Sequence, residues 1–500
     1  MTILSPADER GLIGTTLDAQ LRHAFAKLSP TEVQQVVGQM REESLRRKII
    51  YMRDGETDVI PLMMRPTGVL PDQLGYMHFV ALTLINALKR LPDLYVQDFA
   101  VRRVVPLTSP EEKWLWDNWG PDHRENNPVF GRLDAVVDLT SPMWKDSLHF
   151  LEPNLSGVGG IHLIPNCEQL LAEVVLPALH RHDAHLRLEP GQDLRELFMR
   201  EVLDHLEAIG RPGGNVCFVE PKYSGDGPVE QEALAEYYRV EHGLTIMHAD
   251  PSELYLLDNE VLYNGRRVDV VYRDYEIRDL LDEEVEGVDI MPMRALFRGN
   301  RVVSSLAGDF DHKSCWEILT DPQFTQKYFS ADERQVFRRH VLWTRVLTDR
   351  RTTLADGEMV NLLEYVRKEH DILVLKPNRS YGGDRIIIGS TINQSEWEAA
   401  IEEAVTSAQK GEEQWVVQRL ARIPVYEFPV IAEDGHTSLE PFYTVFGLAP
   451  TKYGLSLLGR ASQKMVVNVA QRGGLCSALV GRPSFRLVGP NTGDKVNQGD

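Results

Sequence analysis

Cysteine is scarce in this chain of 500 residues. Only Cys167, Cys217, Cys315 and Cys476 are present, and no two of them form a CxxC pair. Cysteines scattered so widely favour neither a zinc site nor a disulfide framework, and they fit a reducing compartment. The sequence also lacks an apolar run near the roughly 18 residues of a membrane span. Its first residues, MTILSPADERGLIG, carry acids where a signal peptide has its basic region. We therefore expect a cytoplasmic protein with no membrane partner.

Positive charge is in deficit as well. The formal net charge is −20 and the isoelectric point is near 5.3, which argues against a nucleic-acid backbone or an anionic membrane as the main partner. A local basic pocket for phosphates remains compatible with this balance. The rest of the composition, 43% hydrophobic and 26% charged, is that of an ordinary globular protein. A chain of this length predicts about two to four domains or subdomains.

Polar residues at a two-residue spacing mark the segment 130–160, which is typical of two strands joined by a polar turn. Alternation along each strand puts Arg132 and Asp134 on one face of the first strand, and Glu152 and Asn154 on one face of the second. Mg²⁺ prefers oxygen ligands, usually one or two carboxylates together with substrate phosphates. The pattern favours a metal site beside an arginine, and its plainer alternative is a hairpin with solvated acids.

A second pair of strands is predicted in Ile372–Gly389, around a turn that contains Gly382 and Gly383. Lys376 lies at the end of the first strand of this pair. Glycines let backbone N–H groups close over an anion, and the lysine adds a point charge. The stretch therefore predicts a lid over nucleotide phosphates, with a solvated surface hairpin as the alternative. Gln418, in the strand predicted at 414–420, has an amide that could face adenine.

The segment between these two hairpins predicts a smaller α/β unit. Strands are expected at 215–221 and 268–273, with a helix at 229–242 between them, which is a Rossmann-like succession. Its turn lacks GxGxxG, so no dinucleotide site is expected. Arg273, at a strand end, suits either a substrate carboxylate or phosphate, or a structural ion pair.

Several spaced motifs together resemble the circularly permuted ATP-grasp family, which includes glutathionylspermidine synthase. They are Arg132-Leu133-Asp134, Glu152-Pro153-Asn154, Val270–Arg273, His312-Lys313 and the stretch VLKPN…YGG that begins at Val374. The hairpin at 130–160, with the candidate metal ligands, precedes the lid at 372–389, and this order is that of the permuted family. The chain departs from that family at Asp384, where many relatives carry a lysine, and it has no amidase-like region.

The resemblance implies an α/β (α+β) protein with a permuted ATP-grasp fold and a Rossmann-like subdomain. The implied segments are a helical 1–54, a metal-binding half at 55–185, the Rossmann-like part at 186–300, the lid and adenine part at 301–430, a return to the core at 431–485, and a tail at 486–500. The implied roles are Mg²⁺ binding for Asp134, Glu152 and Asn154, transition-state stabilisation for Arg132, contacts with ATP for Lys313, Lys376, Gly382, Gly383 and Gln418, and substrate binding for Arg273.

These roles imply an ATP-dependent ligase that forms an amide bond through an acyl phosphate. The expected substrates are a small carboxylate and an amine, drawn from amino acids, peptides or polyamines, and the N-terminal helices leave a homo-oligomer open. The main alternative is a non-catalytic ATP-binding scaffold with the same fold. A protein-kinase-like enzyme fits poorly, because Lys376 precedes the glycines and neither HRD nor DFG is present.

Overall fold

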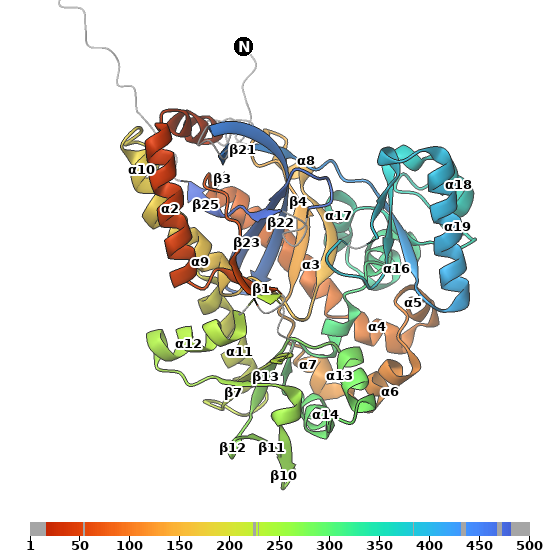
Figure 1. Ribbon diagram of the computed structural model, residues 1–500. Helices are drawn as coiled ribbons and strands as arrows, with labels where there is room; N and C mark the ends of the chain where they lie inside the picture. The colour runs from red at the N-terminus through yellow and green to blue at the C-terminus, as the bar shows by residue number, and fades with distance from the viewer. Residues whose placement is uncertain are drawn as a thin grey trace, which may run out of the picture.

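The computed structural model describes residues 17–53, 56–223, 227–228, 230–383, 385–431, 437–467 and 473–481. In these parts the chain forms a mixed α/β structure with several sheets (Figure 1). The largest sheet has the order β24-β23-β22-β4-β5, with β21 also paired to β22. Its strands are β4 (Arg132–Val136), β5 (His149–Asn154), β21 (Val425–Ile431), β22 (Thr437–Thr451), β23 (Gly454–Ser462) and β24 (Gly474–Leu475). No helix of the described parts is long and apolar enough to span a membrane.

The long hairpin β22–β23 forms the middle of this sheet. The two strands are antiparallel and meet at a tight turn, where Thr451 pairs with Gly454. The sequence pattern favours strands at 442–447 and 454–458, and both are longer in the structure. The sequence pattern also favours a strand at 465–469, but residues 465–467 are not in a strand, and 468–469 lie outside the described residues.

The acidic hairpin folds as predicted. β4 and β5 pair antiparallel, with Arg132 opposite Asn154 and Asp134 opposite Glu152. The register then shifts so that Leu151 has no partner, which makes a β-bulge. This bulge turns Leu151 and Glu152 toward the same side of the sheet, where both line one cavity.

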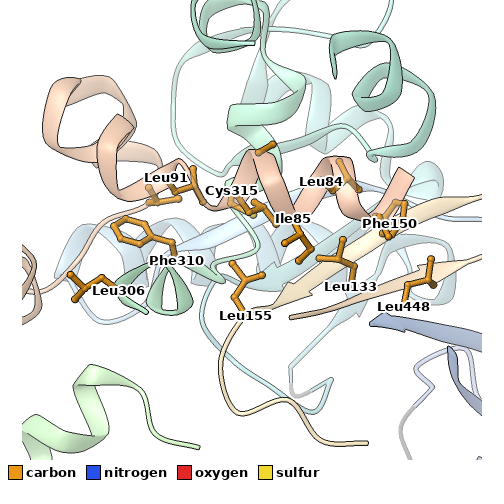
Figure 2. Close-up of a cluster of buried hydrophobic side chains, with 14 of the residues drawn as sticks. Leu84, Ile85, Leu91, Leu133, Phe150, Leu155, Leu306, Phe310, Cys315 and Leu448 are labelled. Atoms are coloured by element: carbon orange, nitrogen blue, oxygen red, sulfur yellow. The ribbon is translucent and has the colours of Figure 1, made fainter. Parts of the chain in front are cut away.

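The other face of the hairpin is covered by α3 (Pro71–Leu88), which was predicted at 71–90. Figure 2 shows Leu84 and Ile85 from α3 beside Leu133 and Phe150 from the two strands. All four side chains are at most 1% exposed and belong to one buried cluster. Burial of this apolar face fixes the register, so the alternate residues of β4 and β5 must face the opposite side.

A separate antiparallel sheet carries the predicted lid. Its order is β15-β20-β18-β19, and its strands are β15 (Thr344–Val346), β18 (Leu373–Pro377), β19 (Ile387–Ile388) and β20 (Trp415–Arg419). One face packs on α18 (Leu362–Lys368) and α19 (Gln394–Lys410), which stand at the right of Figure 1. The fully buried Trp397 of α19 lies in the resulting core, which includes Leu373 and Leu375.

The predicted α/β unit forms a parallel sheet of order β14-β13-β7-β9, at the bottom of Figure 1. The helix between its strands was predicted at 229–242 and is α12 in the structure, residues 230–242. The elements of this unit are β7 (Val216–Val219), α12 (Glu230–His242), β9 (Met247–Ala249), β13 (Val270–Arg273), α13 (Ile277–Val285), α14 (Met291–Arg298) and β14 (Val302–Val303).

The remaining elements surround these three sheets. The further helices are 17–26, α2 (Pro30–Arg46), α4 (Leu91–Gln97), α5 (Phe99–Val104), α6 (Ser109–Asn118), α7 (Pro121–Glu125), α8 (Trp144–Ser147), α9 (Leu163–Leu170), α10 (Leu176–His180), α11 (Leu194–Ala208), α15 (Cys315–Thr320), α16 (Pro322–Tyr328) and α17 (Ala331–His340). The further strands are β1 (Ile50–Arg53), β2 (Glu56–Val59), β3 (Thr67–Val69), β6 (Leu188–Glu189), β8 (Gly227–Pro228), β10 (Tyr255–Leu257), β11 (Glu260–Tyr263), β12 (Arg266–Arg267), β16 (Arg351–Thr353), β17 (Met359–Asn361) and β25 (Ala478–Gly481).

Candidate active site

A cavity of about 540 Å³, here called the central cavity, is lined by residues of the largest sheet and of the lid sheet. It brings together two hairpins that lie more than 200 residues apart in the sequence. The residues singled out from the sequence that line it are Arg132, Asp134, Glu152, Asn154, Lys376, Gly382, Gly383 and Gln418.

Strand alternation explains why polar residues of the lid sheet reach the cavity. In β18, Leu373 and Leu375 pack into the core of the lid, while Val374 and Lys376 line the cavity. In β20, Val417 faces that core and the next residue, Gln418, faces the cavity. Because one face of each strand is buried in the apolar core of the lid, the alternate residues, which include Lys376 and Gln418, face the cavity.

Asp134 is buried between two arginines. Its carboxylate oxygens lie 3.2 Å from Nε of Arg132 and 2.6 Å from a terminal guanidinium nitrogen of Arg460. Burial alone would raise the pKa of this carboxyl, but Arg460 and Arg132 hold the pKa of Asp134 below its usual value. Sequence reasoning missed Arg460, whose only signal is one charged side chain in the largely apolar strand β23.

The side chain of Arg132 is held in a defined place. One guanidinium nitrogen donates to the carbonyl oxygen of Gly159 at 2.8 Å, and its strand neighbour Gly447 leaves room for the side chain. A Cβ added to Gly447 would lie only 2.5 Å from Cδ of Arg132. The glycine is therefore required by the close approach of the arginine.

Glu152 and Asn154 leave oxygen atoms available beside these arginines. The side chain of Glu152 is 24% exposed, and its carboxylate lies 3.4 Å from Nζ of Lys313. Asn154 donates through Nδ2 to the carbonyl oxygen of Arg132 at 3.2 Å. The described part of the chain contains no group of three His, Cys, Asp or Glu residues that could hold a metal ion.

Lys376 and Gln418 form a buried pair on the lid side. Nζ of Lys376 donates to Oε1 of Gln418 at 2.8 Å, and Nε2 of Gln418 donates to Thr344 at 2.9 Å and to the carbonyl oxygen of Leu151 at 3.1 Å. Burial lowers the pKa of Lys376 to about 8, although Glu152 opposes the effect. The amine is therefore poised to titrate in a mildly alkaline range.

Lys313 contacts the edge of the same site from the loop before α15. It is 5% exposed and donates to the carbonyl oxygen of Ser380, at the start of the lid turn, besides its ion pair with Glu152. It is not among the residues that line the central cavity. The structure thus places Lys313 between the metal hairpin and the lid turn.

The lid turn is built on two consecutive left-handed residues. Gly382 and Gly383 have φ values of 70° and 72°, a conformation that side chains other than glycine rarely adopt. The preceding Tyr381 donates through its hydroxyl to Glu276 and, at 3.2 Å, to Asp311. Asp384, where the sequence departs from the resemblance, lies outside the described residues.

Three acids also line the cavity, and the sequence did not predict them. Asp274, Glu276 and Asp279 lie directly after β13, together with Arg278, which forms an ion pair with Glu276 at 2.7 Å. Burial, with repulsion from Glu220 and Glu230, raises the pKa of Asp274 to about 6. The signal was present, because ligand sites of parallel sheets gather at the carboxyl ends of the strands.

Arg273 does not line the cavity. Its side chain is fully buried, and the guanidinium forms an ion pair with Asp309 at 2.6 Å and donates to the carbonyl oxygens of Ser304 and Ser305. Gly308 gives it space, since a Cβ there would lie 2.8 Å from a guanidinium nitrogen. The structure therefore favours the ion pair over substrate binding for this residue.

The wall of the cavity beside Lys376 is apolar. Its residues are Leu151, Val374, Ile386, Ile388, Leu420, Ala421, Ile423, Val445, Met465, Val466 and Val467. Such a wall suits a flat organic ring, while the arginines, lysines and glycines next to it suit a chain of anionic groups. The cavity therefore has one apolar region, one cationic region and one group of acids.

Comparisons with known proteins agree with this architecture at the level of the fold. The structure matches that of a glutathione synthetase-like effector (GSS30) from Globodera pallida with a TM-score of 0.62 and 10% identity, over 91% of this chain and 98% of that one. A protein named as a gamma-glutamylcysteine synthetase, from Methylobacillus flagellatus KT, matches with a TM-score of 0.34 and 9% identity, over 79% and 87% of the two chains, which is too weak to carry an argument. No family model and no curated protein sequence matches the chain. The chain thus shares the fold of a glutathione synthetase-like protein.

Proposed function

We propose that this chain is an ATP-dependent ligase that joins a carboxylate to an amine through an acyl phosphate. The observation that carries the proposal is the central cavity, in which two separate hairpins supply Arg132, Lys376, carboxylates and a glycine turn beside an apolar wall. The glutathione synthetase-like fold supports it. The hairpin with the proposed metal ligands precedes the lid in the sequence, which supports a circularly permuted ATP-grasp arrangement similar to that of glutathionylspermidine synthase.

The cavity suggests how ATP would lie. The adenine would rest on the apolar wall next to Gln418, whose amide is held by Thr344 and Leu151. The triphosphate would then extend past Lys376 to Lys313, under the turn of Gly382 and Gly383. These residues supply fixed charge and backbone donors, which is the main contribution of a protein to phosphoryl transfer.

The residues present fit a magnesium ion. Among the described residues, the carboxylate of Glu152 forms one ion pair, with Lys313 at 3.4 Å, and Asn154 donates through its side-chain nitrogen, which leaves its oxygen available. Two oxygen ligands from the protein are sufficient for Mg²⁺ when phosphates and waters complete the shell. The family resemblance implies Mg²⁺ binding for Asp134 as well. Both of its oxygens contact arginines in this structure, so we propose that Asp134 orients those arginines, with direct metal binding as the alternative. When bound, the ion would neutralise charge on the phosphates.

The reaction follows from this placement. A carboxylate oxygen of the acid substrate attacks the γ-phosphorus, the bond from that phosphorus to the bridging oxygen breaks, and ADP leaves. The amine then attacks the acyl carbon, phosphate leaves with the bonding pair, and the nitrogen loses a proton. Arg132 and Arg460 lie side by side on Asp134 and would stabilise the charge on the transferred group and on the tetrahedral intermediate.

The substrates are proposed only by class: a small carboxylate and an amine, among amino acids, peptides and polyamines. Mg²⁺-dependent ADP release should be measured with pools of these compounds, in the wild type and in Glu152→Ala. The ligase proposal predicts release that needs both an acid and an amine and that Glu152→Ala abolishes. ATP binding without turnover in any pool would instead favour the non-catalytic scaffold.

A further inference from the structure

A second cavity, of about 530 Å³, lies between four helices on the side of the molecule that carries α2 and α12. Its walls come from the end of α2, the first turns of α9 and α11, and one face of α12. The lining residues are Arg46, Arg47, Lys48, His162, Asn166, Gln169, Asp193, Arg195, Ala233, Glu236, Tyr237, Val240 and Glu241. Its volume lies within the range of small-molecule sites. It shares no lining residue with the central cavity.

Two polar side chains in this second cavity, His162 and Asn166, are more than nine-tenths buried yet poorly satisfied. Nδ1 of His162 has no hydrogen-bond partner among the residues that the structure describes. Asn166 makes only long contacts of 3.4 Å, to the carbonyl oxygen of Arg47 and to a guanidinium nitrogen of Arg195. Buried polar groups are normally hydrogen-bonded, because an unmade bond is costly. These atoms are therefore candidates to contact a polar ligand.

Burial, with the nearby Arg195, lowers the pKa of His162 to about 4, so its ring is neutral near neutral pH. Arg195 itself is 3% exposed and stacks over Tyr237, with 3.7 Å between its central carbon and the ring centre. Asp193 binds one side of the Arg195 guanidinium, at 2.6 Å. The other terminal nitrogen has only the long contact with Asn166, and it can still donate to an anion.

The rim of the cavity has two walls of opposite charge. The end of α2 and Lys48 form a basic wall, and α12 contributes Glu236 and Glu241. Lys48 and Glu241 take part in no ion pair within the described ranges of the chain, although they border the same space. Arg46 and Arg47 pair with Glu43, and Glu236 pairs with Arg239, so Lys48 and Glu241 are the rim charges that remain for a ligand.

We propose that the second cavity is a binding site for a small zwitterion of the α-amino acid type, separate from the central cavity. Its carboxylate would be held by Arg195 and Lys48, and its ammonium by Glu241. Asn166 and Nδ1 of His162 would complete the polar contacts. A ligand with only one charge would leave either Lys48 or Glu241 unpaired, which selects a molecule that carries both charges.

One turn connects the two cavities. Gly159 lines the central cavity and accepts from Arg132, and three residues later His162 lines the second. Between them, the carboxylate of Glu230 accepts the backbone N–H groups of Gly160 at 2.8 Å and of His162 at 2.6 Å. The backbone that carries His162 is thus anchored by Glu230.

Calorimetric titration with each of the standard α-amino acids, without nucleotide, tests the proposal. Wild type and Arg132→Ala should bind at least one amino acid with the same affinity, and its decarboxylated amine and its deaminated acid should each bind at least about tenfold more weakly. The absence of nucleotide and of turnover keeps this result independent of the ligase proposal.

Two variants locate the site. Lys48 has a φ of 55°, so Lys48→Gly removes the charge and suits the backbone, and His162→Phe fills the cavity. Each should weaken binding about tenfold or more, while Lys113→Ala, the loss of a remote surface charge, should not change it. The proposal is overturned if no amino acid binds at about 10 mM, if Lys48→Gly and His162→Phe bind as the wild type does, or if Arg132→Ala alone abolishes binding.

Discussion

Nucleotide binding should depend on pH through Lys376. Burial lowers the pKa of this amine to about 8, and an incoming triphosphate favours its charged form. With that pKa, about nine-tenths of the free protein carries the ammonium at pH 7 and about one-tenth at pH 9. If only the charged form binds the phosphates, the Kd rises about tenfold between the two pH values, and binding at pH 9 takes up about 0.9 proton.

Calorimetry with a non-hydrolysable ATP analogue and Mg²⁺, in buffers of different ionisation enthalpy, measures the affinity and the proton uptake together. Lys376→Met is the matched control, because it retains the length of the side chain without the amine. It should bind weakly at both pH values, with a flat profile. The reasoning is refuted if the wild-type Kd is equal at pH 7 and pH 9, or if Lys376→Met retains the same pH dependence.

Three other predictions test the surroundings of the site and the fold. Gly447→Ala should displace the side chain of Arg132 and lower kcat/KM of the ligase about 10- to 100-fold with little loss of stability, and an unchanged kcat/KM would contradict the assigned contact. Arg460→Met and Asp134→Asn should be non-additive in urea unfolding, with a coupling energy of about 1–3 kcal/mol, whereas additive losses would show that the ion pair is unimportant. Burial raises the pKa of Glu168 to about 8. Between about pH 5 and 8 the folded protein therefore keeps the proton of this carboxyl while the unfolded chain loses it, so the free energy of unfolding falls as the pH rises through this range. Glu168→Gln should remove this pH-dependent loss, so its free energy of unfolding should gain about 3 kcal/mol relative to that of the wild type across the range. Parallel curves of unfolding free energy against pH for the two proteins would refute the prediction.

The parts of the site that were predictable from the sequence are those set by local patterns. In β4 and β5, a two-residue alternation puts apolar residues such as Leu133 on the α3 side, which leaves Asp134 and its neighbours on the other. The lid turn was predictable from Gly382 and Gly383, because their backbone conformation nearly requires glycine. Such signals need no knowledge of distant contacts.

What escaped prediction depends on pairing between distant segments. Arg460 reaches Asp134 only because β22 lies between β23 and β4, and nothing in the local sequence specifies that order. The orientation of the Arg273 side chain is likewise set by residues distant in the sequence, through the ion pair with Asp309 and the space that Gly308 leaves. The acids after β13 follow the carboxyl end of a strand, and that position indicates a ligand site only once the strand is known to lie inside a parallel sheet.

The most direct test of the account follows the oxygen atoms of the acid substrate. Once an acid and amine pair supports ADP release, the acid should be supplied with ¹⁸O in its carboxylate, and the released inorganic phosphate should be analysed by mass. An acyl phosphate predicts that one labelled oxygen passes from each acid to phosphate, and that no transfer occurs without Mg²⁺ or in Glu152→Ala. Amide formation with unlabelled phosphate, or ADP release that needs no acid, would contradict it.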